Sequence, residues 1–212
     1  MGKVARCVII AGGSLEDPEY ISTFVTDDDF VICADSGRLN AERMNILPNL
    51  IVGDFDSSEP IKNHMCDVIT LPSEKDDTDT GFALKTAIER GFQQVIILCA
   101  CGGRLDHTYA NLQLLAYARS HGCVAEIIDE KSVISLITAN DSLDLSACNG
   151  RVFSAFSYSD KCTVSVSGVH YPLKDSVLVN SFPLGISNEI EAEHAHISVK
   201  TGFLLVIQNR KI

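Results

Sequence analysis

The strongest constraint on the fold is a change of pattern near residue 128. Before it, short apolar runs alternate with segments of helical periodicity, whereas after it only strand-like segments follow. Several early runs are too continuously apolar to have one face in water, which is typical of strands covered on both sides. We therefore predict an N-terminal α/β domain with a mostly parallel, doubly wound sheet. The predicted strands are 4–11, 30–34, 50–52, 68–71, 95–100 and 124–128.

Two helices are well marked within this α/β half. They are predicted over residues 80–90 and 106–120, and Gly91 and Gly122 stand where each helix should stop. Each also has an acidic residue near its start, where the positive end of the helix dipole stabilises a carboxylate.

The C-terminal half is predicted to be an all-β sandwich. Its strand-like segments alternate apolar residues with Ser, Thr, Lys or His, and no convincing helix interrupts them. The predicted strands are 133–138, 151–157, 162–167, 176–179, 195–200 and 203–208. We therefore expect two domains, 1–130 and 131–212.

Composition narrows the functional classes. With 46% apolar and 21% charged residues the chain is expected to fold, and no apolar run approaches the ~18 residues that a membrane span needs. The start at Met1 has no signal-peptide pattern, so a cytoplasmic location is expected. A net charge of −11 argues against nucleic acid as a partner, and an acidic protein that handles phosphates must recruit cations.

The eight cysteines do not predict a metal or redox site. Several lie inside apolar strand-like runs, where a thiol behaves as a small buried hydrophobe. Cys99 and Cys101 are too close in sequence to form half of a CxxC motif.

Polar motifs follow four of the predicted strands. Because ligands bind beyond the carboxyl ends of strands in such sheets, these motifs are expected to meet at one edge. They are Asp35-Ser36-Gly37, Asp54-Phe55-Asp56, the segment from Lys75 to Asp79, and Gly102-Gly103-Arg104-Leu105-Asp106-His107.

The aspartates of these motifs are candidate metal ligands. Asp54 and Asp56 flank one residue, so in an extended chain both carboxylates point the same way and can bind one Mg²⁺. The alternative is a plain turn in which they cap local amides. Asp79 lies near the start of a helix and is a plausible third ligand. Asp76 and Asp77 fit either a helix cap or a nucleotide contact.

The basic residues and glycines of the same edge suit phosphate binding. Arg104 is a candidate phosphate clamp because a guanidinium fork matches phosphate oxygens, and the alternative is a salt bridge to a neighbouring Asp. Lys75 supplies a second positive charge. His107 fits a capping role as well as a catalytic one. The chain has no GxxxxGK[ST] loop, but Ala11-Gly12-Gly13-Ser14 can let a ligand approach the backbone. His194 and His196 share a strand face and are interpreted as surface residues.

Taken together, these motifs resemble the thiamin pyrophosphokinase family. The likeness lies in the order and spacing of Asp35-Ser36-Gly37, Gly53-Asp54-Phe55-Asp56-Ser57, Lys75-Asp76-Asp77-Thr78-Asp79, Gly102-Gly103-Arg104-Leu105-Asp106-His107 and Ser187-Asn188-Glu189, and it covers nearly the whole chain. It implies a homodimer that transfers the pyrophosphoryl group of ATP to the hydroxyl of thiamin, giving thiamin diphosphate and AMP.

The resemblance also implies roles for individual residues. Residues 1–130 would form the catalytic domain that binds ATP and Mg²⁺, and 131–212 the thiamin-binding domain. By this likeness the metal ligands are Asp54, Asp56 and Asp79, the nucleotide and its phosphates are bound by Asp35, Lys75, Asp76, Thr78 and Arg104, and Asp106, Ser187 and Asn188 face thiamin, with the site shared between subunits.

One departure and two alternatives stand beside the resemblance. Some family members stack thiamin on a tryptophan; this chain has none, which leaves Phe182 or Tyr171 as the flat aromatic wall. Asp54 and Asp56 also have the spacing of haloacid dehalogenase-type phosphatases, although that motif normally follows the first strand. A nucleotide or thiamin sensor without turnover is the non-enzymatic alternative.

Overall fold

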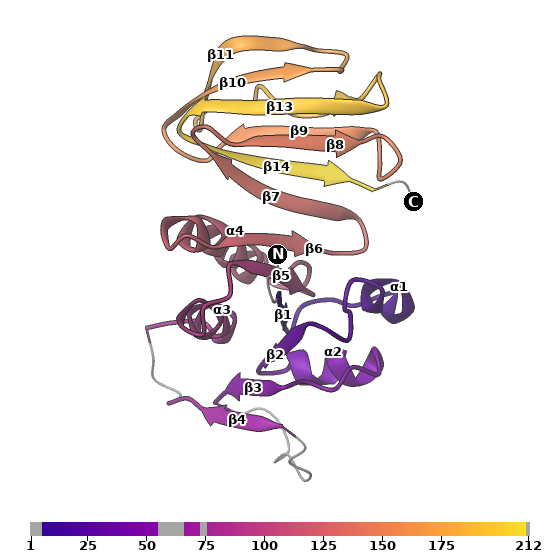
Figure 1. Ribbon diagram of the computed structural model, residues 1–212, viewed down its shortest axis with the longest axis vertical. Coiled ribbons are helices and arrows are strands. Elements are labelled where there is room, and N and C mark those ends of the chain that lie inside the picture. Colours follow the sequence, from indigo (N-terminus) through magenta and orange to yellow (C-terminus); the bar gives the residue numbers. More distant parts are fainter. Residues whose placement is uncertain (1–5, 55–65, 73–75, 211–212) are drawn as a thin grey trace. The chain divides into compact units, whose positions relative to one another are not determined.

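The computed structural model describes residues 6–54, 66–72 and 76–210 and divides the chain into two compact units. The division falls between Glu130 and Lys131; we call the parts the α/β unit and the β unit. The elements of the α/β unit (Figure 1) are β1 (Cys7–Ile10), α1 (Pro18–Ser22), β2 (Phe30–Ala34), α2 (Gly37–Arg43), β3 (Leu50–Gly53), β4 (Asp67–Thr70), α3 (Asp79–Glu89), β5 (Gln94–Leu98), α4 (Leu105–Ser120) and β6 (Val124–Ile128).

The strands of the α/β unit pair in the order β6–β5–β1–β2–β3–β4, and each of these pairings is parallel. The central strands β1 and β2 are covered: all four residues of β1 have no exposed surface, and residues 31–34 of β2 are at most 4% exposed. Figure 1 shows α2 and α3 on opposite faces of these strands. The prediction of a parallel sheet wound on both faces is therefore confirmed.

The sequence pattern gave no bounds for two short helices of this unit. The helix α1 has five residues and α2 has seven, so neither is long enough to show a clear apolar period. The start of α1 nevertheless carries a local signal, because the Asp17 side chain accepts a hydrogen bond from the Tyr20 amide and Pro18 occupies the first helical turn.

The β unit consists of antiparallel strands, as predicted. One set pairs in the order β12–β9–β14–β7 and the other in the order β11–β10–β13–β8. Buried side chains from both sets, such as Phe153, Val164, Ile197 and Leu204, form one core. The strands are β7 (Ser132–Thr138), β8 (Ser142–Ser146), β9 (Val152–Ser157), β10 (Lys161–Ser167), β11 (Leu173–Val179), β12 (Asn188–Glu189), β13 (His194–Thr201) and β14 (Phe203–Asn209).

Two of these strands were not predicted. The segment of β8 reads SLDLS, with a charge in its centre, and β12 has only two residues. Both exist because of tertiary pairing: β8 pairs with β13, and β12 pairs with β9.

Five of the eight cysteines are buried, as expected of small hydrophobes. All eight are free thiols, and burial raises the pKa of Cys7, Cys33, Cys99 and Cys101 to about 12. These thiols therefore stay protonated at neutral pH and are poor nucleophiles. Among the described helices, none combines the length and the apolar character that crossing a membrane would take.

Candidate active site

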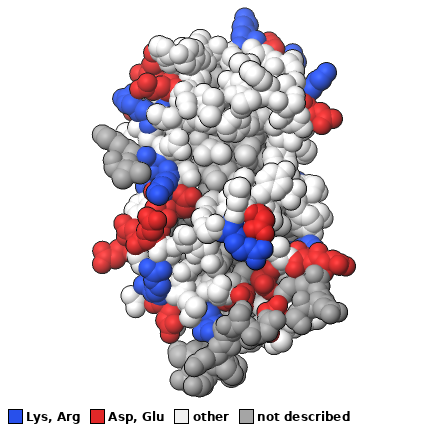
Figure 2. All heavy atoms as spheres, turned by 180° about the vertical axis from the view of Figure 1, so that it is seen from behind, with Lys and Arg blue, Asp and Glu red and all other residues white. Residues whose placement is uncertain are grey.

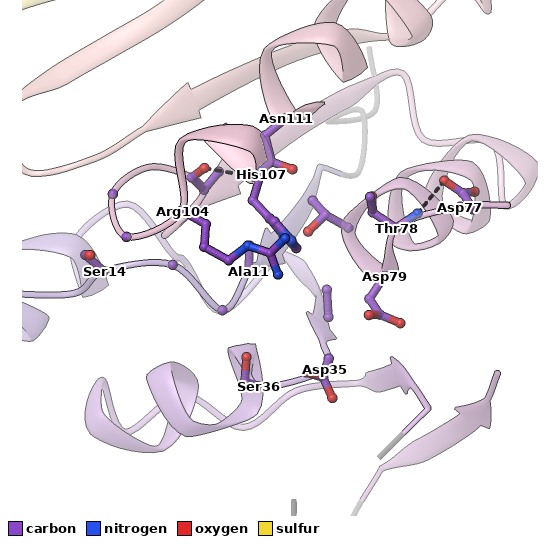
Figure 3. Close-up of a pocket in the computed structure, with 17 residues that line it drawn as sticks. Ala11, Ser14, Asp35, Ser36, Asp77, Thr78, Asp79, Arg104, His107 and Asn111 are labelled. Atoms are coloured by element: carbon purple, nitrogen blue, oxygen red, sulfur yellow. Dashed lines mark hydrogen bonds between the residues drawn. The ribbon is translucent and has the colours of Figure 1, made fainter. Parts of the chain in front are cut away.

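A cavity of about 630 Å³ lies in the α/β unit where the loops after its strands come together. Its lining comes from residues 11–14 after β1, 34–36 at the end of β2, 77–80 at the start of α3, and residues between 100 and 107 after β5, together with Asn111 of α4. Figure 3 shows these side chains arranged around one space. Three of the four predicted motifs therefore contribute directly to one cavity.

One wall of the cavity is made of backbone. The Asn40 side chain of α2 donates to the carbonyl oxygens of Ala11 and Gly13, both at 3.0 Å, and fixes the loop after β1. A Cβ atom on Gly13 would lie 2.4 Å from the Cys99 carbonyl oxygen, so only glycine fits here. Such a wall allows a ligand to approach the main chain closely.

Asn111 fixes the opposite loop in the same way. It is buried in α4 and donates to the carbonyl oxygen of Ala100 at 2.8 Å. Sequence reasoning missed both Asn40 and Asn111, because an asparagine within a helix reads as an ordinary surface residue. Their role becomes visible only in the tertiary structure, since each side chain donates a hydrogen bond to a loop that follows a different element.

Asp35 combines backbone strain with an unpaired buried oxygen. Its φ angle is +46°, in the left-handed region, and its amide donates to the Val52 carbonyl at 2.7 Å. Its Oδ1 atom is buried and has no hydrogen-bond partner among the described residues. A buried carboxylate oxygen left alone is costly. Asp35 therefore lines the cavity in a state that suits a cation or a hydrogen-bond donor.

The contacts at the start of α3 distinguish the roles of Asp77, Thr78 and Asp79 in the second acidic motif. Thr78 is the N-cap, and its hydroxyl accepts from the Gly81 amide at 3.0 Å. Asp77 is engaged structurally, because one carboxylate oxygen accepts from the Thr78 amide at 2.9 Å and the other contacts Lys85 Nζ at 2.7 Å. Asp79 is the first helical residue, and in Figure 3 its carboxylate points to the side of the cavity where Asp35 lies.

Arg104, which lines the cavity, forms a two-point ion pair with Asp106. The Nη2–Oδ2 distance is 2.6 Å and the Nε–Oδ1 distance 3.2 Å, and both side chains are largely exposed. The hydrogen bond from Arg104 lowers the pKa of the Asp106 carboxyl and raises that of the guanidinium. Of the two interpretations from sequence, this structure has the salt bridge, and Arg104 also lines the cavity.

The remaining predicted residues of the α/β unit lie at different places. Asp54 follows β3 directly and is partly buried, and a Cβ on the preceding Gly53 would lie 3.0 Å from the Asp35 Cα. Asp76 is exposed and lines a neighbouring groove between the start of α3 and the outer side of α4. His107 lines the main cavity. Asp56 and Lys75 fall outside the described residues.

In the β unit, the motif residue Asn188 holds the main chain of Tyr171. The Asn188 side chain is 8% exposed; its Oδ1 accepts from the Tyr171 amide at 3.0 Å and its Nδ2 donates to the Tyr171 carbonyl at 2.9 Å. Ser187 has a φ of +55° and donates its amide to the Ser154 hydroxyl at 3.1 Å. Tyr171 itself is 64% exposed.

Fold and site together define a class of protein. A cavity of carboxylates, an arginine and a backbone wall suits a group-transfer enzyme of the kinase type, in which positioning and charge neutralisation carry the reaction. A separate all-β unit with an aromatic ring on its surface suits recognition of the acceptor.

Comparison with known proteins identifies the family. Residues 21–127 match the family Thiamin pyrophosphokinase, catalytic domain, and residues 131–204 match Thiamin pyrophosphokinase, vitamin B1 binding domain. The chain belongs to the thiamin pyrophosphokinase family. It is therefore a thiamine diphosphokinase, in a family that uses ATP, and neither the phosphatase nor the sensor alternative is supported.

Relatives support this assignment over the full length. The chain is 26% identical over 207 residues to a thiamine pyrophosphokinase of Bacillus subtilis (strain 168), covering 95% of this chain and 97% of that protein. The crystal structure of the thiamine pyrophosphokinase from Bacillus subtilis superposes with a TM-score of 0.85 at 25% identity, covering 98% of this chain and 100% of the other. That of Geobacillus thermodenitrificans gives 0.82 at 26% identity, covering 97% and 98%.

Proposed function

We propose that the cavity of the α/β unit binds the triphosphate of ATP together with Mg²⁺, and that Asp54, Asp56 and Asp79 hold the ion. The observation that carries this proposal is the buried, unpartnered Oδ1 of Asp35 beside the acidic start of α3. Carboxylate oxygens are the ligands that Mg²⁺ prefers. When bound, the ion neutralises charge on the triphosphate oxygens.

The residues of the chain then position the reaction. The amides at the start of α3 and the backbone wall of residues 11–14 face the phosphates, where a helix N-terminus favours an anion. The thiamin hydroxyl oxygen forms a bond to the β-phosphorus in line with the bond to the α-phosphate oxygen, which breaks and releases AMP. The hydroxyl proton passes to a base, for which Asp106 and a metal-bound carboxylate are the two candidates.

The Arg104–Asp106 pair links the two substrates in this scheme. Its guanidinium fork matches phosphate oxygens as well as it matches the Asp106 carboxylate. Transfer of the fork to the triphosphate releases Asp106 toward thiamin. ATP binding therefore prepares the acceptor side of the site.

For the acceptor we propose that Tyr171 is the aromatic wall, in preference to Phe182. Both rings are exposed, at 64% and 63%. Only Tyr171 has its main chain clamped by a buried residue of the thiamin motif, Asn188. The thiazolium of thiamin is a cation, and an aromatic face attracts a cation. In this scheme Asn188 and Ser187 serve thiamin through the loop that they hold.

We further propose a homodimer in which the site is shared between subunits. A chain of net charge −11 repels its own copy, so an uncharged surface favours association. The β unit offers one: Tyr171, Phe182, Leu184 and Ile186 are each about 60% exposed. Figure 2 shows a broad area without charged side chains over this unit.

The first experiment measures AMP release from ATP and Mg²⁺ with and without thiamin, with the product identified by mass. Thiamin-dependent AMP and a thiamin diphosphate product are expected. Activity that persists after removal of divalent ions with a chelator would contradict the proposed metal.

The shared site is tested by mixing subunits. We expect Asp79→Asn and Tyr171→Ala each to be nearly inactive at low thiamin. If they are refolded together in equal amounts, half of the dimers are mixed and each holds one intact site, so about a quarter of wild-type activity should return. Activity that stays at the sum of the two variants, or a monomer by light scattering, would exclude the shared site.

A further inference from the structure

Tyr171 is exposed but its ring is not isolated. The centroid of the His170 ring lies 4.6 Å from the centroid of the Tyr171 ring, and the planes cross at 86°. This T-shaped geometry is one of the favoured arrangements of two aromatic rings. Together with the Asn188 clamp on its main chain, it fixes a side chain that is 64% exposed.

The imidazole of His170 is itself held by Glu191. The distance from His170 Nδ1 to Glu191 Oε1 is 2.6 Å, and because an ionised carboxylate only accepts, Nδ1 carries the proton. The main chain adds two bonds: the His170 amide donates to the Glu189 carbonyl at 2.9 Å and the Glu191 amide to the Gly168 carbonyl at 3.1 Å. Glu191, His170 and Tyr171 thus form a connected series of contacts.

We infer that His170, held by Glu191, is a positioning residue that sets the Tyr171 ring for thiamin; this inference rests on the proposed function. It acts through the ring and touches no reacting atom. The Glu191 carboxylate also balances any positive charge on the imidazole, which would otherwise repel a cation bound at the Tyr171 face. Loss of His170 therefore weakens thiamin binding without altering the transfer step.

A purely structural role explains the pair less well. The His170 and Glu191 side chains are 54% and 60% exposed, and exposed ion pairs add little to stability. The β unit contains a matched pair, His196 and Asp144, with a distance of 2.7 Å and exposures of 52% and 69%. It lies on β13 and β8 and does not include the neighbour of Tyr171. A contribution to folding alone would make the two pairs equivalent.

The test is a kinetic comparison of four variants. In His170→Ala we expect KM for thiamin to rise roughly three- to tenfold, the size of an aromatic pair, with kcat and KM for ATP unchanged. His170→Phe keeps a ring at the Tyr171 edge and should restore most of the wild-type KM. Glu191→Gln should shift KM in the same direction by a smaller factor, and the control His196→Ala should leave it unchanged.

Several results would overturn the inference. An unchanged KM for thiamin in His170→Ala, an equal rise in His196→Ala, or no recovery in His170→Phe would each do so. If wild-type protein releases no thiamin-dependent AMP, the proposed function fails, and calorimetric titration of thiamin into the same four variants still tests the positioning role through Kd. Absence of thiamin binding to wild type would overturn both.

Discussion

In the α/β unit the predicted site residues extend from loops into one cavity, whereas in the β unit they hold another residue in place. Asp35, Thr78, Asp79 and Arg104 all line the same cavity. Asn188, by contrast, uses both ends of its amide on the Tyr171 main chain. Parallel strands bring their polar loops together at one edge, while an antiparallel sandwich presents residues on its surface.

This difference between the two units corresponds to two kinds of interaction with substrates: those made in the transition state and those that only hold a bound substrate. Groups that face developing charge act in the transition state and affect kcat, and groups that only hold a substrate affect KM. We therefore expect substitutions in the cavity to lower kcat and substitutions around Tyr171 to raise KM for thiamin.

The largest effect is expected from Asp79→Asn. Loss of one carboxylate from the proposed metal site should lower kcat by a factor on the order of 10³, or about 4 kcal/mol, because a neutral amide compensates phosphate charge poorly. The measurement is steady-state AMP formation at saturating thiamin and Mg²⁺. Asp144→Asn, in the β unit, serves as the control and should retain near wild-type kcat. Full activity of Asp79→Asn would show that Asp79 is not a metal ligand. Equal losses of kcat in Asp79→Asn and Asp144→Asn would contradict the expectation that only substitutions in the cavity lower kcat.

A smaller loss is expected from Arg104→Lys. A lysine keeps the charge but cannot form the two-point contact, so kcat should fall by about ten- to a hundredfold. Arg119→Lys, at the other end of α4, is the matched control and should be close to wild type. Burst-phase measurement of AMP separates the transfer step from product release. Wild-type kinetics in Arg104→Lys would show that Arg104 serves only in the ion pair with Asp106 and does not bind phosphate.

Two buried side-chain amides, Asn40 in the α/β unit and Gln208 in the β unit, allow the two units to be compared through the free energy of unfolding. Asn40 holds the loop after β1, and Gln208 of β14 donates to the carbonyls of Ser146 and Gly150 at 2.9 and 2.8 Å. Alanine at either position leaves two carbonyls without their donor, and we expect a loss of about 2–3 kcal/mol in the free energy of unfolding by urea. Only Asn40→Ala should also raise KM for ATP, several-fold, since only its loop lines the cavity. A similar rise in Gln208→Ala would mean that general destabilisation affects the site.

The sequence was most informative where local pattern and tertiary environment agree. A continuous apolar run such as residues 30–34 coincides with the observed strand because buried parallel strands need apolar residues on both faces. The strand β8 was missed because its central Asp144 reads as a loop, yet that residue faces solvent and its partners on β13 supply the pairing. A strand such as β8, with a charged residue at its centre, can be identified only when the strand that pairs with it is known.

The same distinction applies to the candidate site. An aspartate or an arginine that follows a strand can be recognised as a candidate site residue from its type and position alone. Asp35, Asp79 and Arg104 could therefore be proposed as site residues from the sequence. Asn40, Asn111 and the His170–Glu191 pair could not, since their partners lie up to 29 residues away in sequence. Supporting residues are common polar side chains whose role depends on what they contact.

The smallest effect concerns the pH dependence of stability in the α/β unit. The Asp29 side chain is 3% exposed, and this burial would raise its pKa. Hydrogen bonds from Arg6, with Nε at 2.8 Å, and from the Thr26 amide outweigh the effect of burial and lower the pKa. The unfolded chain thus takes up the proton at higher pH than the folded chain does. The stabilisation is complete above the ordinary Asp pKa near 3.9 and is lost as the pH falls through the lower folded value.

Asp29→Asn should therefore cost about 1.5–2 kcal/mol of unfolding free energy at pH 7, measured with urea, and progressively less below about pH 4, where wild type loses the same contribution. The corresponding variant in the β unit is Asp175→Asn, which removes an exposed pair with Lys200 at 3.5 Å. It should change stability by less than about 0.5 kcal/mol at either pH, because solvent screens both charges. A constant difference between wild type and Asp29→Asn across this pH range would show that packing, rather than the charge on Asp29, accounts for its contribution.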